Sequence, residues 1–162
     1  MRYHNITKDD MLNGDGLRTV LWLSGCEHRC EGCQNPVTWD INDGLEFDDS
    51  AKKELFSYLS LPYISGITFS GGDPLHHANR KDVGRLIAEI KQNFPNKTIW
   101  LYTGYTFEDI MDLDFIKCID VLVDGRFILA LKDTALKWKG SSNQRVIDVK
   151  KTFETGKIVL HA

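Results

Sequence analysis

Three cysteines, Cys26, Cys30 and Cys33, lie within eight residues of the chain and form the pattern Cys-x3-Cys-x2-Cys. Thiolates at this spacing on one loop can ligate three of the four irons of a [4Fe-4S] cluster. The remaining cysteine, Cys118, lies 85 residues beyond Cys33, in a stretch that is typical of the interior of an element. We therefore expect the fourth iron to lack a protein ligand, which leaves a coordination position free for chemistry.

The same loop also admits a structural zinc site, in which His28 or His4 completes a Cys3His ligand set. Such sites usually pair a Cys-x2-Cys knuckle with a distant second pair of ligands, so this spacing favours iron and sulfide over zinc. A redox disulfide is disfavoured because a third nearby thiol would compete for the pair. Three unrelated core cysteines are disfavoured because the residues between them, Glu27 and Arg29 included, are polar.

A second unusual segment, Gly-Gly-Asp-Pro at residues 71–74, follows the apolar run 64–69. Two glycines are as typical of a plain turn as of a ligand-binding loop. Glycine also lets a backbone approach a ligand closely, and Pro74 stiffens the exit from the segment. Asp73 adds a carboxylate that suits an ammonium group, so we predict that this segment lies beside the cysteine loop.

Apolar runs alternate with helical patterns along the chain, which is typical of an α/β fold. Amphipathic periodicity predicts helices over 51–59 and 83–94, and Thr106 with Asp109 predicts the start of a shorter third helix. Continuous β-prone runs predict four buried parallel strands, at 19–23, 64–69, 98–102 and 119–123.

Ligands of parallel α/β folds bind at the carboxyl ends of the strands, and the unusual residues of this chain follow the predicted strands. A complete barrel of eight such units takes about 250 residues, so 162 residues predict a partial, incomplete parallel β/α barrel in a single domain, 1–162. The segment 127–157 has weak periodicity and supports no structural prediction.

Composition narrows the function classes. The formal charge is −3, with 42% hydrophobic and 27% charged residues, so the chain has no basic footprint for nucleic acid or for an anionic membrane. The N-terminus lacks the apolar core of a signal peptide, and no run of about 18 apolar residues occurs. We expect a cytoplasmic protein whose cysteines stay reduced.

The cysteine loop together with residues 71–74 resembles the radical S-adenosylmethionine (SAM) superfamily. Further motifs, from Tyr3 to about Arg145, resemble the activating proteins of the anaerobic (class III) ribonucleoside-triphosphate reductase. Gly32 stands where most of the superfamily has an aromatic residue, as in these activases, whereas Gln34 replaces an aromatic residue that they often have. The motifs that match are Asn13-Gly14-Asp15-Gly16, Ser24-Gly25-Cys26, Gly32-Cys33-Gln34-Asn35, Trp39, residues 70–75, Trp100, residues 103–105, residues 121–125 and residues 140–144.

The resemblance implies an enzyme with a [4Fe-4S] cluster that cleaves SAM reductively and generates a glycyl radical. The implied partners are the large subunit of the anaerobic reductase and an electron donor such as reduced flavodoxin. Two alternatives stay open: the same chemistry on another glycyl-radical enzyme or a small molecule, and a zinc-stabilised binding module that is not an enzyme.

The resemblance also implies roles for residues of this chain. Cys26, Cys30 and Cys33 would be the catalytic ligands of the cluster. Cofactor contacts would come from Gly32, Cys33 and Gln34 at adenine, from Gly71, Gly72 and Asp73 at the methionine amino group, and from Thr103, Asp124, Ser141 and Asn143 at ribose, carboxylate or partner. From the residues alone, His28 is interpreted as a solvated loop residue, Cys118 as a buried apolar group, His76 and His77 as turn residues, and the four tryptophans as core or interface.

Overall fold

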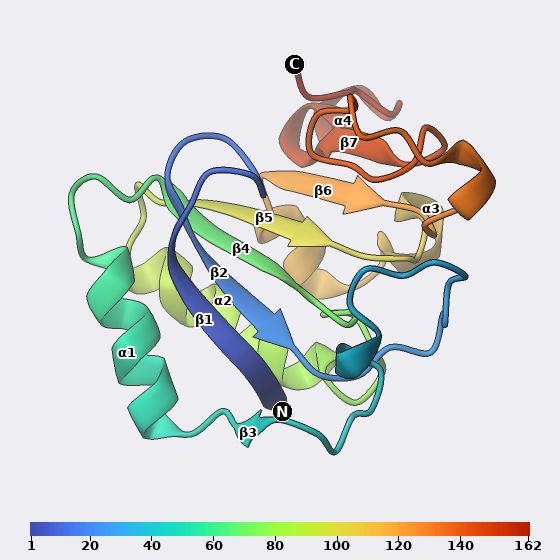
Figure 1. The fold of residues 1–162 in the computed structure, drawn as a ribbon. Coiled ribbons are helices and arrows are strands. Elements are labelled where there is room, and N and C mark those ends of the chain that lie inside the picture. The colour runs from blue at the N-terminus through green and yellow to red at the C-terminus, as the bar shows by residue number, and fades with distance from the viewer.

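The computed structural model describes every residue from Met1 to Ala162. Seven strands form one sheet in the order β3-β1-β2-β4-β5-β6-β7, with helices packed against it (Figure 1). None of the helices has the length and apolar character needed to cross a membrane.

Four strands in the middle of the sheet are parallel, as predicted. They are β2 (Arg18–Leu23), β4 (Gly66–Gly71), β5 (Thr98–Tyr102) and β6 (Val121–Asp124). Their buried residues form nearly continuous apolar runs, because a central parallel strand is covered on both faces. The carboxyl ends of all four strands therefore lie along one edge of the sheet.

The expectation of a wholly parallel sheet is wrong at both edges. The strand β1 (Arg2–Asp10) pairs antiparallel with β2 and with the short β3 (Leu45–Glu46), and β7 (Arg145–Asp148) pairs antiparallel with β6. An edge strand needs only one apolar face, and β1 buries only two of its nine side chains. Its polar sequence therefore lacks the continuous apolar run that marked the central strands.

The two long helices, α1 (Asp49–Leu59) and α2 (Arg80–Asn93), confirm the predicted periodicity. The short α3 (Phe107–Ile110) begins at the predicted Thr106, whose capping box with Asp109 is complete. A fourth helix, α4 (Val149–Thr155), was not predicted. Short 3-10 helices lie at η1 (Pro36–Thr38), η2 (Asp114–Cys118) and η3 (Leu129–Leu131).

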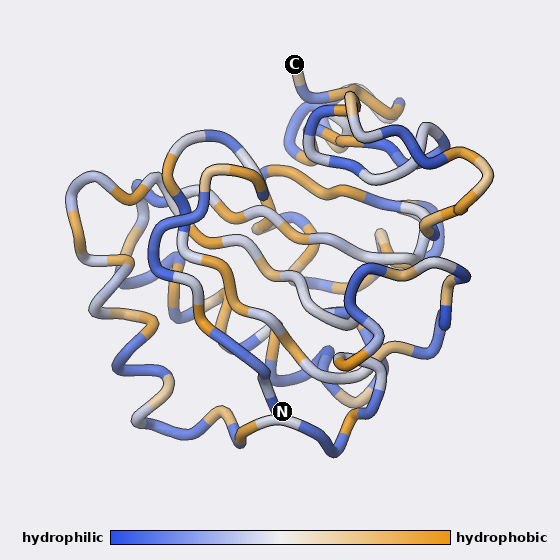
Figure 2. Tube along the Cα trace, in the orientation of Figure 1, coloured by the Kyte–Doolittle hydropathy of each residue, from blue (hydrophilic) through white to orange (hydrophobic).

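The two faces of the sheet differ. Both α1 and α2 pack on one face, where 24 buried residues, Leu21, Phe69 and Leu101 among them, form the main core. Figure 1 shows α2 behind the sheet and α1 at its left side, and Figure 2 shows the hydropathy alternating along the strands in front of α2. The opposite face, which we call the helix-free face, has a smaller apolar cluster around Trp100. A ligand can therefore reach the sheet from the helix-free face.

Cys118 corrects a second expectation. It is the last residue of η2 and is exposed, not a buried apolar group. It lies in a connection between elements, where the backbone runs at the surface.

Candidate functional site

An open cavity of about 860 Å³ lies on the helix-free face at the carboxyl ends of the parallel strands. Trp22, Ser70 and Tyr102 contribute to it from β2, β4 and β5. Most of the predicted site residues line this cavity: Cys26, Cys30, Cys33, Gln34, Gly71, Gly72, Asp73 and Thr103. The structure thus brings the cysteine loop and the segment 71–74 to one place.

The cysteine loop connects the end of β2 with η1. Two backbone hydrogen bonds close its base: the Gly25 amide donates to the Thr38 carbonyl at 2.7 Å, and the Cys26 amide donates to the Trp39 carbonyl at 3.0 Å. All three cysteines of the loop are free and half-buried. Three thiols on one closed loop facing one cavity are the arrangement that a three-thiolate cluster needs.

The surroundings of the sulfurs fit such a cluster. Burial raises the pKa of the Cys26 thiol, and hydrogen bonds from the backbone of His28 and Arg29 oppose this shift. The Asn35 amide donates to Cys33 Sγ at 3.4 Å. Hydrogen bonds of this kind stabilise thiolates and tune iron–sulfur clusters.

A single-ion zinc site fits less well. No three His, Cys, Asp or Glu side chains lie close enough together to hold one metal ion, whereas each thiolate of a cubane ligates a different iron. His28, a candidate fourth zinc ligand, has one of its two ring nitrogens, Nε2, 2.7 Å from the Asp73 carboxylate.

The two glycines of the segment 71–74 allow two strand ends to pack tightly. The Gly72 amide donates to the Leu23 carbonyl at 2.8 Å, and the Asp73 amide donates to the Gly25 carbonyl at 2.7 Å. A Cβ at Gly71 would lie 2.3 Å from the Leu23 nitrogen, and one at Gly72 would lie 2.5 Å from the Gly25 oxygen. Glycine is required here because the segment is hydrogen-bonded directly to the start of the cysteine loop.

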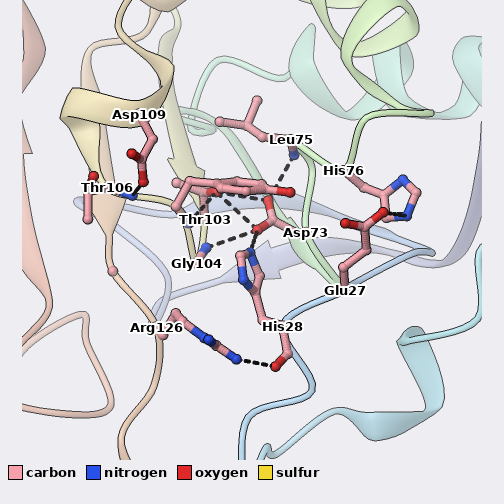
Figure 3. Close-up of polar contacts among 12 residues, drawn as sticks. Glu27, His28, Asp73, Leu75, His76, Thr103, Gly104, Thr106, Asp109 and Arg126 are labelled. Atoms are coloured by element: carbon pink, nitrogen blue, oxygen red, sulfur yellow. Dashed lines mark hydrogen bonds and ion pairs between the residues drawn. The ribbon is translucent and has the colours of Figure 1, made fainter.

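Asp73 lies at the centre of a polar network (Figure 3). Its side chain is 2% exposed, and the carboxylate accepts hydrogen bonds from the Leu75 and Gly104 amides at 2.9 Å and from the Thr103 hydroxyl at 2.9 Å, and it pairs with His28. A carboxylate offers about four acceptor positions, so these partners fill it. An ammonium group at Asp73 would have to compete with donors of the chain itself.

The interpretation of His28 as a solvated residue is wrong. Its side chain is 12% exposed, and its ring packs edge-on against Tyr105 with centroids 4.6 Å apart. A buried carboxylate is stable only when it is paired or hydrogen-bonded, and His28 of the cysteine loop is one of the partners of Asp73. By contrast, His76 and His77 do lie in the turn after Pro74, as predicted, and His77 is exposed.

Four predicted site residues do not line the cavity. Asp124 and Asn143 line an adjoining groove of about 700 Å³, which shares His28 with the cavity. Asp124 is buried and bonded to Arg145 Nη2 at 2.5 Å. The other two are Ser141, which is buried and accepts from the Ile128 amide, and Gly32, which packs on Leu129. Their roles toward a cofactor stay predictions.

Sequence reasoning missed one wall of the cavity. Residues 132–134 and 136–140 line the cavity, as do Met11 and Leu12, which are 75% and 80% exposed. Most of this wall comes from irregular chain without periodicity, and among its residues only Gly140 belongs to a motif noted in the sequence. Trp138 lies in this wall and packs on the core residue Trp100, which agrees with the interpretation of both as core or interface.

Comparison with known proteins assigns the family. A family model described as a 4Fe-4S single cluster domain matches residues 12–147. The anaerobic ribonucleoside-triphosphate reductase-activating protein of Enterobacteria phage T4 is 47% identical over 146 residues, covering 90% of this chain and 93% of that protein. The chain belongs to this family of activating proteins.

Other members of the activating-protein family support the assignment. The Escherichia coli K12 protein of the same name is 41% identical over 150 residues, covering 90% of this chain and 97% of that protein. The Vibrio cholerae protein is 40% identical over 148 residues, covering 89% and 96%. The resemblance to activating proteins is thus confirmed, and the matched range 12–147 includes every predicted site residue.

Proposed function

We propose that this activating protein is a radical SAM enzyme that generates a glycyl radical on the large subunit of an anaerobic ribonucleoside-triphosphate reductase. One observation supports this most strongly: three free cysteines and residues 71–73 line one cavity, and backbone hydrogen bonds join the cysteine loop to the segment 71–74. The names of the relatives point to an anaerobic ribonucleoside-triphosphate reductase as the partner, and the matching family model points to a 4Fe-4S cluster.

A bound cluster would supply one electron for cleavage of the sulfonium–C5′ bond of SAM, and the released 5′-deoxyadenosyl radical would take a hydrogen atom from Cα of a reductase glycine. Methionine, 5′-deoxyadenosine and the glycyl radical are then the products. The electron would come from reduced flavodoxin or a similar carrier in a reducing, cytoplasmic setting.

Residues of the chain provide binding and orientation in this proposal. Cys26, Cys30 and Cys33 would hold three irons, and the backbone of 71–73 would face the methionine amino group at the remaining iron. Gln34 lines the cavity and would lie on the adenine side. Fixing reactants in a productive geometry lowers a barrier by up to roughly 7 to 11 kcal/mol in the best cases.

The open helix-free face suits a macromolecular target. We propose that the sheet is a partial barrel of the radical SAM type. Because the barrel is incomplete, its open side leaves the cavity accessible to a segment of the reductase. Exposed Met11 and Leu12 at the cavity offer apolar contact area for such a segment.

Anaerobic reconstitution tests this function. Reconstituted protein should hold about four irons and sulfides, form 5′-deoxyadenosine from SAM with dithionite, and give an EPR doublet on the reductase only after mixing. Absence of SAM cleavage contradicts the proposal. One zinc per chain without sulfide supports the binding-module alternative, and cleavage coupled only to another glycyl-radical enzyme or to a small molecule supports a different target.

A further inference from the structure

His28 occupies the middle of the Cys26–Cys30 arc of the cysteine loop, and three other strand ends contact it. Its Nε2 lies 2.7 Å from Oδ2 of Asp73, which follows β4. Both side chains are nearly excluded from solvent, at 12% and 2% exposed. Because the Asp73 amide also bonds to the Gly25 carbonyl, the loop and the segment 71–74 are joined at two points.

The strand ends of β5 and β6 hold the same residue from other directions (Figure 3). The ring of His28 lies so close to Gly104 that a Cβ there would be 2.4 Å from the imidazole Cδ2. Tyr105 packs edge-on against the other part of the ring. Arg126, which follows β6, donates from Nη2 to the His28 carbonyl. The loop is thus attached to all three neighbouring strand ends through one residue.

We propose that His28 is a positioning residue that fixes the Cys26–Cys30 arc relative to the segment 71–74. The proposal rests on the proposed function, because this spacing then sets the distance between the cluster and the methionine end of SAM. In this proposal His28 acts through its bond to Asp73, with Nε2 of His28 2.7 Å from Oδ2 of Asp73. Residues that orient metal ligands typically contribute 10- to 100-fold to affinity or activity.

The first test uses metal-free protein. In His28→Ala, hydrogen exchange of the amides in residues 26–33 should be at least about tenfold faster than in the wild type, while the central strands keep their protection. His28→Gln, whose amide can still donate to Asp73, should restore slow exchange. Arg85→Ala removes an exposed side chain from α2 and should change nothing. Unchanged exchange in His28→Ala overturns the proposal.

The second test uses reconstituted protein. His28→Ala keeps its three cysteines and should retain iron and sulfide, but the SAM-induced change in the cluster EPR spectrum should shrink and the SAM Kd should rise about tenfold or more. His28→Gln should recover most of the SAM affinity. Wild-type SAM affinity and a full spectral change in His28→Ala overturn the proposal.

A second variant covers the case in which His28→Ala does not fold. Gly104→Ala leaves His28 and Asp73 in the chain but displaces the imidazole, so it should accelerate loop exchange in the same way. Slow loop exchange in Gly104→Ala would count against the proposal. If wild-type protein fails to cleave SAM, the proposed function fails, whereas the exchange measurement on metal-free protein still decides the role of His28.

Discussion

The two ends of the parallel strands contrast with each other. At the amino ends, Arg18 is fully buried and its guanidinium donates to Thr68 Oγ1, to the Ile67 and Asp15 carbonyls, and to both oxygens of Thr98. At the carboxyl ends, an open cavity exposes half-buried thiols. Polar groups occur at both ends, but only one end leaves them available to a ligand.

This contrast separates stability from function. Burial lowers the pKa of Arg18 to about 10, so at neutral pH the guanidinium keeps its charge and is satisfied by neutral oxygens of the chain. Trp100 packs against it, with the guanidinium 5.6 Å from the ring centroid. The hydrogen-bonding groups of Arg18 are therefore satisfied within the chain, whereas the three loop cysteines are half-buried and line an open cavity. Substitutions at the two ends should have different consequences.

The largest effect is expected at the open end. Cys30→Ser should abolish cluster binding and SAM cleavage, because only two thiolates remain on the loop. The free energy of unfolding of metal-free protein should change by less than about 0.5 kcal/mol. Iron analysis and urea unfolding check both statements, with the exposed Cys118→Ser as the control that keeps its iron.

At the amino ends of the strands, substitution of Arg18 should reduce the stability of the fold. Arg18→Leu leaves carbonyl and hydroxyl acceptors unpaired in the interior and should lower the free energy of unfolding by roughly 3 kcal/mol. The exposed Arg85→Ala should change it by less than about 0.5 kcal/mol. Equal urea midpoints for Arg18→Leu and the wild type would show that the network does not stabilise the fold.

Packing between the loop and β4 should be intermediate. Gly72→Ala places a methyl group 2.5 Å from the Gly25 carbonyl oxygen, where backbone must move, and should destabilise by about 1 to 3 kcal/mol. Gly140→Ala is the matched control, because its nearest neighbour is the movable ring of Phe127 at 3.1 Å. If both variants unfold at the same urea concentration, the strand ends tolerate separation.

The smallest effect is expected at an exposed ion pair beside the groove. The hydrogen bond from Arg145 lowers the pKa of Glu108 below its usual value of 4.5. A lowered carboxyl pKa stabilises the fold above the unfolded value, and this contribution disappears as pH falls from about 4.5 through the folded value. Glu108→Gln should thus cost less than about 1 kcal/mol at pH 7 and nothing at low pH. A cost that persists in acid would assign the effect to packing.

The central strands and the long helices could be predicted from sequence because each is specified by its own apolar pattern. The antiparallel edges could not, since β1 is held by pairing with β2 more than by apolar content. The strand β7 and the helix α4 lie within the weakly periodic segment 127–157, where tertiary contacts and not a local apolar pattern decide the structure.

Some features of the candidate site could likewise be predicted from the sequence, and others could not. The cysteines could be identified because their ligand spacing lies within eight residues. The pairing of His28 with Asp73 joins residues 45 positions apart, so no local pattern contains it. The same holds for the cavity wall at 136–140, which lines the same cavity as the cysteines although more than 100 residues separate them in the chain.

The hydrogen-bonded base of the cysteine loop should allow a lost iron–sulfur cluster to be rebuilt. Gly25 and Cys26 pair with Thr38 and Trp39 through the backbone alone, so loop closure does not depend on a metal. When oxygen destroys the cluster, the metal-free chain should keep the closed conformation of its cysteine loop and should be able to bind a new cluster. Damaged molecules could then regain iron and sulfide in place, without new synthesis of the chain.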